Sequence, residues 1–295
     1  MTKARSAFRN QLEAALVRSL IATAAHAPFS FSLAIARLLD KVAPRMRASA
    51  ERNLQLALPN LDAKLTTDAV YENLARLLYY FSRFSTRNAA NIRDWMDCEG
   101  AQYYVAAKAK GKGVLFATGH LGNWEVSAFA HAYLTEPMNV VVRPLDNPVL
   151  DAFIKRNRML SGNRILDKQD FLRAILKALA NNEAVGILID QNTMPDNGAF
   201  VDFFGHPACT GTTFAKLAHK TGAAVLPGYA LWSEQRQKFI LKFDPVFAMT
   251  GDVVTDTANL TKHFEQVIRE NPTQWLWLHR RWKTRPPGQP DLYAK

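Results

Sequence analysis

The chain has little cysteine, and its histidines do not form metal-binding patterns. Only Cys98 and Cys209 occur in 295 residues, and their separation fits neither a zinc site nor a disulfide framework. We therefore expect a reducing compartment and two packed, inert thiols. His206 and His219 have no Asp, Glu or Cys at a metal-ligand spacing, and His219 lies in an apolar helical pattern as a packing residue. The sequence predicts no metal.

A long hydrophobic run is also absent. The uncharged stretch between Arg18 and Arg37, SLIATAAHAPFSFSLAIA, has 18 residues, the minimum for a membrane-spanning helix. A histidine, a proline and three serines interrupt it, and it has no cleavage signature of a signal peptide. We expect two amphipathic helices that lie on a bilayer surface. The alternatives are two ordinary helices of a soluble domain and a single marginal anchor.

Acidic residues are the minority among the charged side chains. The chain has 37 Lys and Arg against 26 Asp and Glu, a formal net charge of +11, and its first 52 residues hold nine basic and three acidic residues. Such a balance suits nucleic acid, an anionic membrane or an acidic protein. No helix-turn-helix, zinc or RNA-binding signature accompanies the charge, so we expect no nucleic-acid partner.

Apolar patterning divides the chain into two parts. Residues 1–95 are expected to form a helical, membrane-associating segment, with a short helix within 48–59 and a long one within 62–85. Residues 96–295 alternate short apolar strands with helices, which predicts an α/β domain whose central sheet is flanked by helices. The predicted strands are 114–117, 139–142, 185–189, 224–230 and 239–243, and the predicted helices are 101–110, 124–133, 148–159, 171–181, 212–221 and 256–270.

A histidine follows the first of these strands. The stretch 111–125 reads GKGVLFATGHLGNWE, so the apolar strand is followed by His120 and then by a helix with Glu125 in its first turn, where a carboxylate is favoured. An imidazole with a near-neutral pKa can act as a general base, and Glu125 would orient the ring and stabilise the imidazolium. A hydrogen-bonded structural histidine is the alternative.

Polar side chains also follow two other predicted strands. Arg143 directly follows the strand 139–142, and Asp190 and Gln191 follow the strand 185–189. Ligands of α/β sheets bind beyond the carboxyl ends of the strands, so we expect these side chains at the same crevice as the histidine. Surface arginines and ordinary turn residues are the alternatives.

The string GHLGNWE resembles the HxxxxD/E motif of the glycerolipid and lysophospholipid acyltransferase superfamily, and its longer form resembles the lipid A late acyltransferases. Three other segments agree: 141–171 (VVRPLDNPVLDAFIKRNRMLSGNRILDKQDF), 187–192 (ILIDQN) and 275–288 (WLWLHRRWKTRPPG). The resemblance spans about Arg45 to the C-terminus. It implies a mixed sheet of the glycerol-3-phosphate acyltransferase type, and transfer of a fatty acyl chain from acyl carrier protein to a hydroxyl of a lipid A precursor. It also implies the cytoplasmic face of the inner membrane and no cofactor besides the thioester donor.

The resemblance carries roles to individual residues. His120 and Glu125 are expected to be catalytic, and Arg158 matches an arginine that the family associates with the phosphorylated part of a substrate. A guanidinium suits phosphate because its planar fork donates two parallel hydrogen bonds. The predicted substrate-binding residues are Asn123, Arg143, Arg158, Asp190 and Gln191.

Two aromatic segments admit two interpretations each. Residues 198–218 resemble the family's phenylalanine-rich loop, in which Phe203 and Phe204 would either line an acyl channel or pack in the core. In 275–287 tryptophans and cations alternate, which suits a membrane interface or the acidic acyl carrier protein; a helix buried on its tryptophan side is the alternative.

No serine or cysteine lies in a nucleophile elbow, so we expect direct transfer without an acyl-enzyme. The backbone amides of residues 119–122 are the expected oxyanion hole. An acyltransferase for another lysolipid, such as lysophosphatidate or an ornithine lipid, is the alternative within the superfamily. A non-catalytic membrane-binding protein is the alternative outside it, although such a protein would not need the pair His120 and Glu125.

Overall fold

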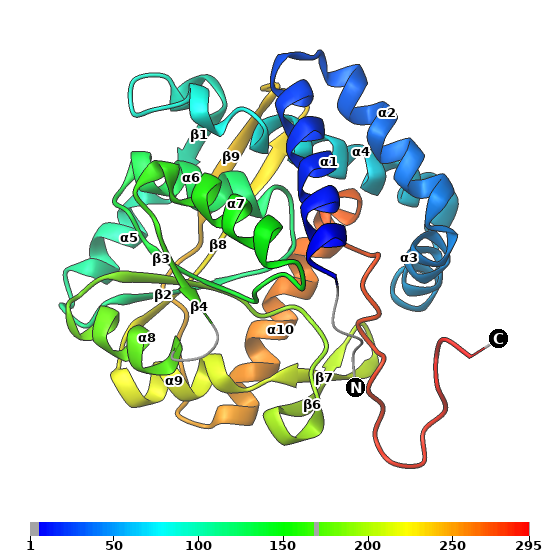
Figure 1. Cartoon of the computed structure of the whole chain (residues 1–295). Helices are drawn as coiled ribbons and strands as arrows, with labels where there is room; N and C mark the ends of the chain where they lie inside the picture. Colours follow the sequence, from blue (N-terminus) through cyan, green and yellow to red (C-terminus); the bar gives the residue numbers. More distant parts are fainter. Residues whose placement is uncertain (1–5, 168–170, 295) are drawn as a thin grey trace.

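The computed structural model describes residues 6–167 and 171–294 (Figure 1). Helices come first, and strands then alternate with helices. The helices are α1 (Ala7–His26), α2 (Phe29–Val42), α3 (Pro44–Ala57), α4 (Ala63–Phe81), α5 (Ala101–Lys108), α6 (Trp124–Leu134), α7 (Pro148–Arg158), α8 (Phe171–Ala180), α9 (Thr213–Thr221) and α10 (Val253–Glu270). The strands are β1 (Met96–Glu99), β2 (Val114–Thr118), β3 (Asn139–Val142), β4 (Arg164–Asp167), β5 (Ala184–Leu188), β6 (Gly198–Phe203), β7 (His206–Gly211), β8 (Ala224–Ser233) and β9 (Lys238–Phe243).

Seven of the strands form one mixed sheet in the order β1-β9-β8-β2-β5-β3-β4. Strands β8 and β9 are antiparallel, and the other neighbouring pairs are parallel. The expected α/β fold with a mixed central sheet is therefore confirmed. The predicted strands and helices beyond residue 100 are present within three residues of their expected ends.

Helices cover both faces of this sheet, and β2 contributes to both cores. Leu115 and Ala117 lie in the core that includes residues of α8, α9 and α10, whereas Val114 and Phe116 lie in the core that includes residues of α5 and α6. A strand that is buried on both faces reads as a continuous apolar run, which explains the composition of β2. Its carboxyl end therefore emerges between two packed layers.

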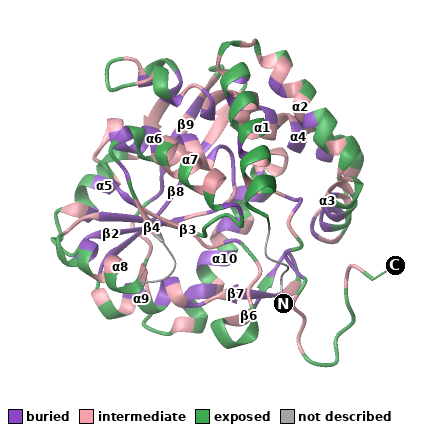
Figure 2. Cartoon of the chain, viewed as in Figure 1, coloured by how far each residue is buried: buried purple, intermediate pink, exposed green. Residues whose placement is uncertain are grey.

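The N-terminal helices pack on the α/β part and leave apolar residues outside. Chain direction changes at Pro28, because a proline cannot continue α1. Helix α1 lies along α7, where the Asn147 side-chain amide donates to the carbonyl of Asn10 at 2.9 Å. Figure 2 shows exposed residues along the outer sides of α1 and α2. Of the helices in the described ranges, none has the length and apolarity needed to cross a membrane.

In each of the two aromatic segments, the structure contradicts one of the two interpretations given above. Residues 198–211 form the hairpin β6–β7 rather than a loop, and Phe203 and Phe204 are buried in the core. Trp275, Trp277 and Trp282 are also buried, in a stretch without regular helix. The interpretation of these tryptophans as membrane-interface residues is wrong, because they pack against one another and against Phe203. The segment is not a helix either.

Candidate active site

The loop between β2 and α6 is fixed by backbone hydrogen bonds to distant segments. The Gly122 amide donates to the carbonyl of Gln274 at 2.7 Å, and the Asn123 amide donates to the carbonyl of Ala230 at 2.9 Å. Gly122 has a φ of +59°, and a Cβ atom there would lie 1.9 Å from the Ala230 oxygen, so only glycine fits. The loop thus holds His120 in one place at the carboxyl end of β2.

Asp190 orients the imidazole of His120. The His120 Nδ1 atom lies 2.9 Å from Asp190 Oδ1, and the His120 backbone amide donates to Asp190 Oδ2 at 2.7 Å. Trp275 Nε1 donates to the same Oδ2 at 2.8 Å. Because the carboxylate accepts at Nδ1, the ring carries its hydrogen there and leaves Nε2 as the basic nitrogen. The Gln191 side-chain amide lies next to that nitrogen, with Nε2 to Nε2 at 3.3 Å.

The pair has the electrostatics of a base and its supporting carboxylate. Burial lowers the pKa of His120, but the charge and hydrogen bond of Asp190 outweigh burial, so the pKa lies above the usual value of histidine. Burial raises the pKa of Asp190, but the imidazole and the donated hydrogen bonds lower it to about 2. Asp190 is therefore ionised wherever His120 titrates.

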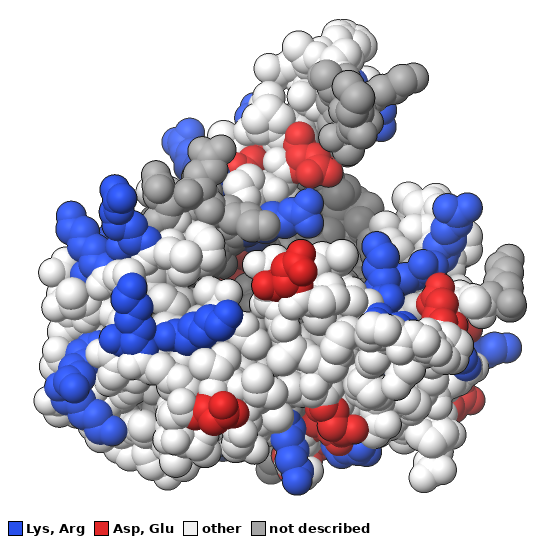
Figure 3. All heavy atoms as spheres, turned by 90° about the horizontal axis from the view of Figure 1, so that it is seen from below, with Lys and Arg blue, Asp and Glu red and all other residues white. Residues whose placement is uncertain are grey.

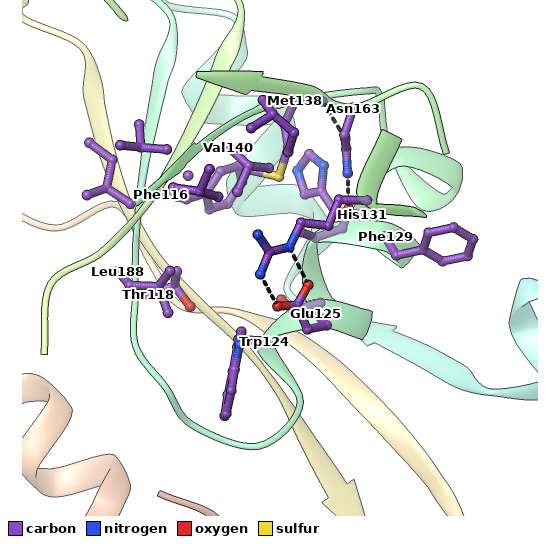
Figure 4. A pocket seen from close by; sticks show the side chains of 18 of the residues that line it. Phe116, Thr118, Trp124, Glu125, Phe129, His131, Met138, Val140, Asn163 and Leu188 are labelled. Atoms are coloured by element: carbon purple, nitrogen blue, oxygen red, sulfur yellow. Dashed lines mark hydrogen bonds and ion pairs between the residues drawn. The ribbon is translucent and has the colours of Figure 1, made fainter. Parts of the chain in front are cut away.

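Glu125 has a different partner from the one expected. Its carboxylate accepts two hydrogen bonds from Arg158, at 2.9 Å from Nε and 2.6 Å from Nη2, which Figure 4 draws as dashed lines. Burial lowers the pKa of Arg158, but the Glu125 carboxylate raises it by more, so the pKa of Arg158 lies above its usual value. The expectation that Glu125 orients the imidazole is wrong, because Asp190 holds that position. Glu125 acts on His120 through its charge, which raises the pKa of the imidazole.

The other groups predicted at the site are Asn123, Arg143 and the backbone amides of residues 119–122. Asn123, a predicted substrate-binding residue, is fully buried, and its side-chain oxygen caps α6 by accepting from the Val126 amide. Arg143 is exposed at the rim of the pocket described next. The expected oxyanion hole is wrong in part, because the amides of His120 and Gly122 already donate to Asp190 and Gln274.

A pocket of about 420 Å³ opens beside this pair, in the range typical of small-molecule sites (Figure 4). Polar groups line the part near the loop: His120, Glu125, Arg158, Arg143 and Gln191. Most of the other lining side chains are apolar and come from the sheet face and from α6. Phe203 and Phe204 lie in the core that includes α8, α9 and α10, so their assignment to an acyl channel is wrong. Among the residues that the structure describes, no three His, Cys, Asp or Glu side chains are grouped as metal ligands.

Sequence reasoning placed Asp190 at this edge but did not pair it with His120, and it missed the roles of Trp275 and Gly122. The parallel pairing of Thr118 with Leu188 brings the ends of β2 and β5 together. Only the order of strands in the sheet carries that information. The tryptophan lies 85 residues after its carboxylate partner, so no local pattern could connect them.

Known proteins and one protein family match this chain over most of its length. The model of a family described as bacterial lipid A biosynthesis acyltransferase matches residues 4–284. A lipid A biosynthesis palmitoleoyltransferase of Escherichia coli (strain K12) is 29% identical over 259 residues, which cover 84% of this chain and 82% of that protein. A lipid A biosynthesis acyltransferase of Haemophilus influenzae is 30% identical over 264 residues, covering 86% and 83%. A phosphatidylinositol mannoside acyltransferase of Mycobacterium tuberculosis is 28% identical over 224 residues, covering 72% and 69%.

Proposed function

Because the chain belongs to the bacterial lipid A biosynthesis acyltransferase family and is therefore an acyltransferase, we propose that it moves a fatty acyl chain from acyl carrier protein to a hydroxyl of a lipid A precursor. One observation carries the catalytic part of this proposal. His120, which Asp190 orients, lines a largely apolar pocket that can receive an acyl chain. The proposed reaction uses no cofactor besides the acyl carrier protein thioester.

In the proposed step His120 Nε2 takes the proton from the acceptor hydroxyl as its oxygen attacks the thioester carbonyl. Asp190 keeps the ring in the correct tautomer and stabilises the imidazolium that forms. The tetrahedral intermediate then expels the thiolate of the carrier, which receives the proton from the imidazolium. General-base assistance of this kind contributes about 10²–10⁴-fold.

Charge on the oxygen of the intermediate needs donors near His120. The side-chain amide of Gln191 lies beside the basic nitrogen, and Arg158, which Glu125 holds, also lines the pocket. Glu125 thus fixes a cation that lines the same pocket. Its own negative charge raises the pKa of His120, whereas the charge of Arg158 lowers it. Donors of this kind stabilise a developing oxyanion because they are already oriented.

An acyl carrier protein is strongly acidic, so its docking surface on this chain should be basic. Figure 3 shows Lys and Arg side chains gathered at both sides of one face, with Asp and Glu scattered between them. Arg280 and Lys283 are exposed in the C-terminal segment, although the tryptophans beside them are buried. These exposed cations support acyl carrier protein as the acyl donor. We predict that the KM for acyl carrier protein rises with salt concentration.

We also propose that α1 and α2 rest on an anionic membrane, as a peripheral attachment to the cytoplasmic face of the inner membrane. Phe8, Leu12 and Leu16 recur every four residues on one side of α1 and are 79%, 52% and 64% exposed. Basic residues flank them along the same segment, which suits anionic headgroups. Flotation with phosphatidylglycerol vesicles should weaken when Leu12 and Leu16 become glutamine. Equal flotation by this variant would contradict the attachment.

The acceptor can be tested directly with a panel of lipids. The purified protein and lauroyl–acyl carrier protein are incubated with a lipid A precursor, lysophosphatidate, an ornithine lipid or a phosphatidylinositol mannoside, and products are identified by mass spectrometry. The last three represent the second candidate, an acyltransferase for another lysolipid, which the mycobacterial relative favours. Acylation of the lipid A precursor alone supports the proposal, and acylation of another lipid alone refutes it. His120→Ala should lose most of this acyl transfer. His26→Ala, at an exposed histidine at the end of α1, is its matched control.

A further inference from the structure

Two glycines lie inside strands on the wall of the pocket. Gly186 is in β5 and Gly228 is in β8, and both line the cavity. Neither has a positive φ, so the backbone conformation does not require glycine at these positions. A glycine inside a strand weakens the sheet and often marks a close approach by another group. The lack of a side chain at these two positions therefore leaves space inside the pocket.

The space that each glycine provides can be described atom by atom. A Cβ atom at Gly228 would lie 3.3 Å from the rings of Phe116 and Phe243, closer than ordinary contact. A Cβ atom at Gly186 would lie 2.8 Å from the Cε atom of Met138. An added methyl group at either position would thus occupy the cavity or push a neighbouring side chain into it.

Met138 belongs to the deep end of the same pocket. It directly precedes β3, whose Val142 lines the pocket near the carboxyl edge where the base lies. The four residue steps from Met138 to Val142 span roughly 13 Å along a strand. His131 also lies deep, six residues after Glu125 in α6, which is about 9 Å along a helix.

The deep end is closed by side chains that carry no charge. The imidazole of His131 packs against Phe116, with ring centroids 4.9 Å apart, and its Nδ1 pairs with the Glu136 carbonyl at 3.0 Å. Burial lowers the pKa of His131 to about 4, so the ring is neutral at physiological pH. A methionine is flexible and fills irregular gaps, so Met138 is the part of this floor that can move most easily.

We propose that Gly186, Gly228 and Met138 determine the length of the acyl chain that the enzyme accepts. The inference rests on the proposed function, because it needs the acyl chain in this pocket with its carbonyl beside His120. The chain then runs along the sheet face between the two glycines, and its methyl end stops at Met138. Each methylene that the pocket can no longer hold lowers the preference for that donor by about fourfold.

The test compares Gly186→Ala, Gly228→Ala and Met138→Ala with the wild type. Met194→Ala is the matched control, because Met194 is 63% exposed in a loop. Decanoyl-, lauroyl-, myristoyl- and palmitoyl-acyl carrier protein are supplied in turn, and the ratio of kcat/KM values between donors is recorded. Both alanine substitutions at glycine should shift this ratio toward shorter chains by about fourfold or more, and Met138→Ala should shift it toward longer chains. Met194→Ala should leave it unchanged.

A ratio that stays at the wild-type value in all three variants would overturn the inference while leaving the proposed function intact. Equal loss with every donor would also overturn it, because a general effect on folding or catalysis does not depend on chain length. Calorimetric binding of acyl-thioether pantetheine analogues of the same four lengths gives a readout without turnover. Wild-type protein that binds these analogues with the predicted length dependence but transfers no acyl chain would refute the proposed function alone. Binding without such a shift between variants would refute the inference.

Discussion

Replacing Asp190 with asparagine separates the orientation of His120 from its presence. The two side chains have the same shape, but only the carboxylate accepts at both oxygens. Asp190 Oδ2 receives two donors, the His120 amide at 2.7 Å and Trp275 Nε1 at 2.8 Å. In Asp190→Asn the amide oxygen therefore takes this position and the NH₂ group faces His120 Nδ1. The ring must then accept at Nδ1 and carry its hydrogen at Nε2.

This tautomer cannot take a proton from the acceptor hydroxyl. We expect the loss of general-base assistance, about 10²–10⁴-fold in kcat. The pH dependence should change as well, because the base acts only when it is neutral. In the wild type the carboxylate raises the pKa of His120, so the rate falls on the acid side of a midpoint above the usual histidine value. Without the carboxylate burial prevails, and the midpoint should move to lower pH.

The assay is the rate of acyl transfer across a pH series, with ¹⁵N NMR of the imidazole to identify the protonated nitrogen. Asp202→Asn, at an exposed carboxylate in β6, is the matched control. Wild-type turnover by Asp190→Asn, or an unchanged acid limb, would refute the assignment of Asp190 as the residue that positions the base.

Four further substitutions test other parts of the structure. Glu125→Ala and Arg158→Ala should each destabilise the fold by about 1–3 kcal/mol, because the remaining charge loses its partner, and the double variant should lose less than the sum in urea denaturation. Trp277→Ala should lower the free energy of unfolding by about 3–5 kcal/mol, because its side chain is fully buried, and should leave vesicle flotation unchanged. Normal thermal melting with reduced flotation would instead show that Trp277 contacts the membrane. Gly122→Ala should abolish activity even if circular dichroism shows a folded protein, because its Cβ atom meets the Ala230 oxygen; an active variant would show that the loop tolerates displacement.

Local patterns predict the architecture well because each element carries its own signal. The apolar run of β2 and the amphipathic pattern of α10 identify a strand and a helix without any partner. The short strands β1 and β4 escaped prediction, since four residues with mixed polarity do not give a period. The resemblance to the family's phenylalanine-rich loop predicts a loop where the hairpin β6–β7 lies. Its strands pair with each other rather than with the main sheet.

The site was only partly predictable, because partner choice depends on the order of strands in space. His120, Glu125, Arg158 and Asp190 were all named from the sequence, yet their pairing differs from expectation. Five residues of separation suggested that Glu125 would contact the imidazole, but the start of α6 turns its carboxylate toward the end of α7. Asp190, 70 residues away, arrives at the ring because β5 is the parallel neighbour of β2.

In the proposed mechanism His120 is the base that activates a lipid hydroxyl. The most direct measurement is the single-turnover rate of acyl transfer from lauroyl–acyl carrier protein to a lipid A precursor by the wild type and by His120→Ala, with the product identified by mass. We predict a product heavier by one acyl chain with the wild type and a rate about 10²–10⁴-fold lower with the folded variant. Equal rates for the two proteins would contradict the account.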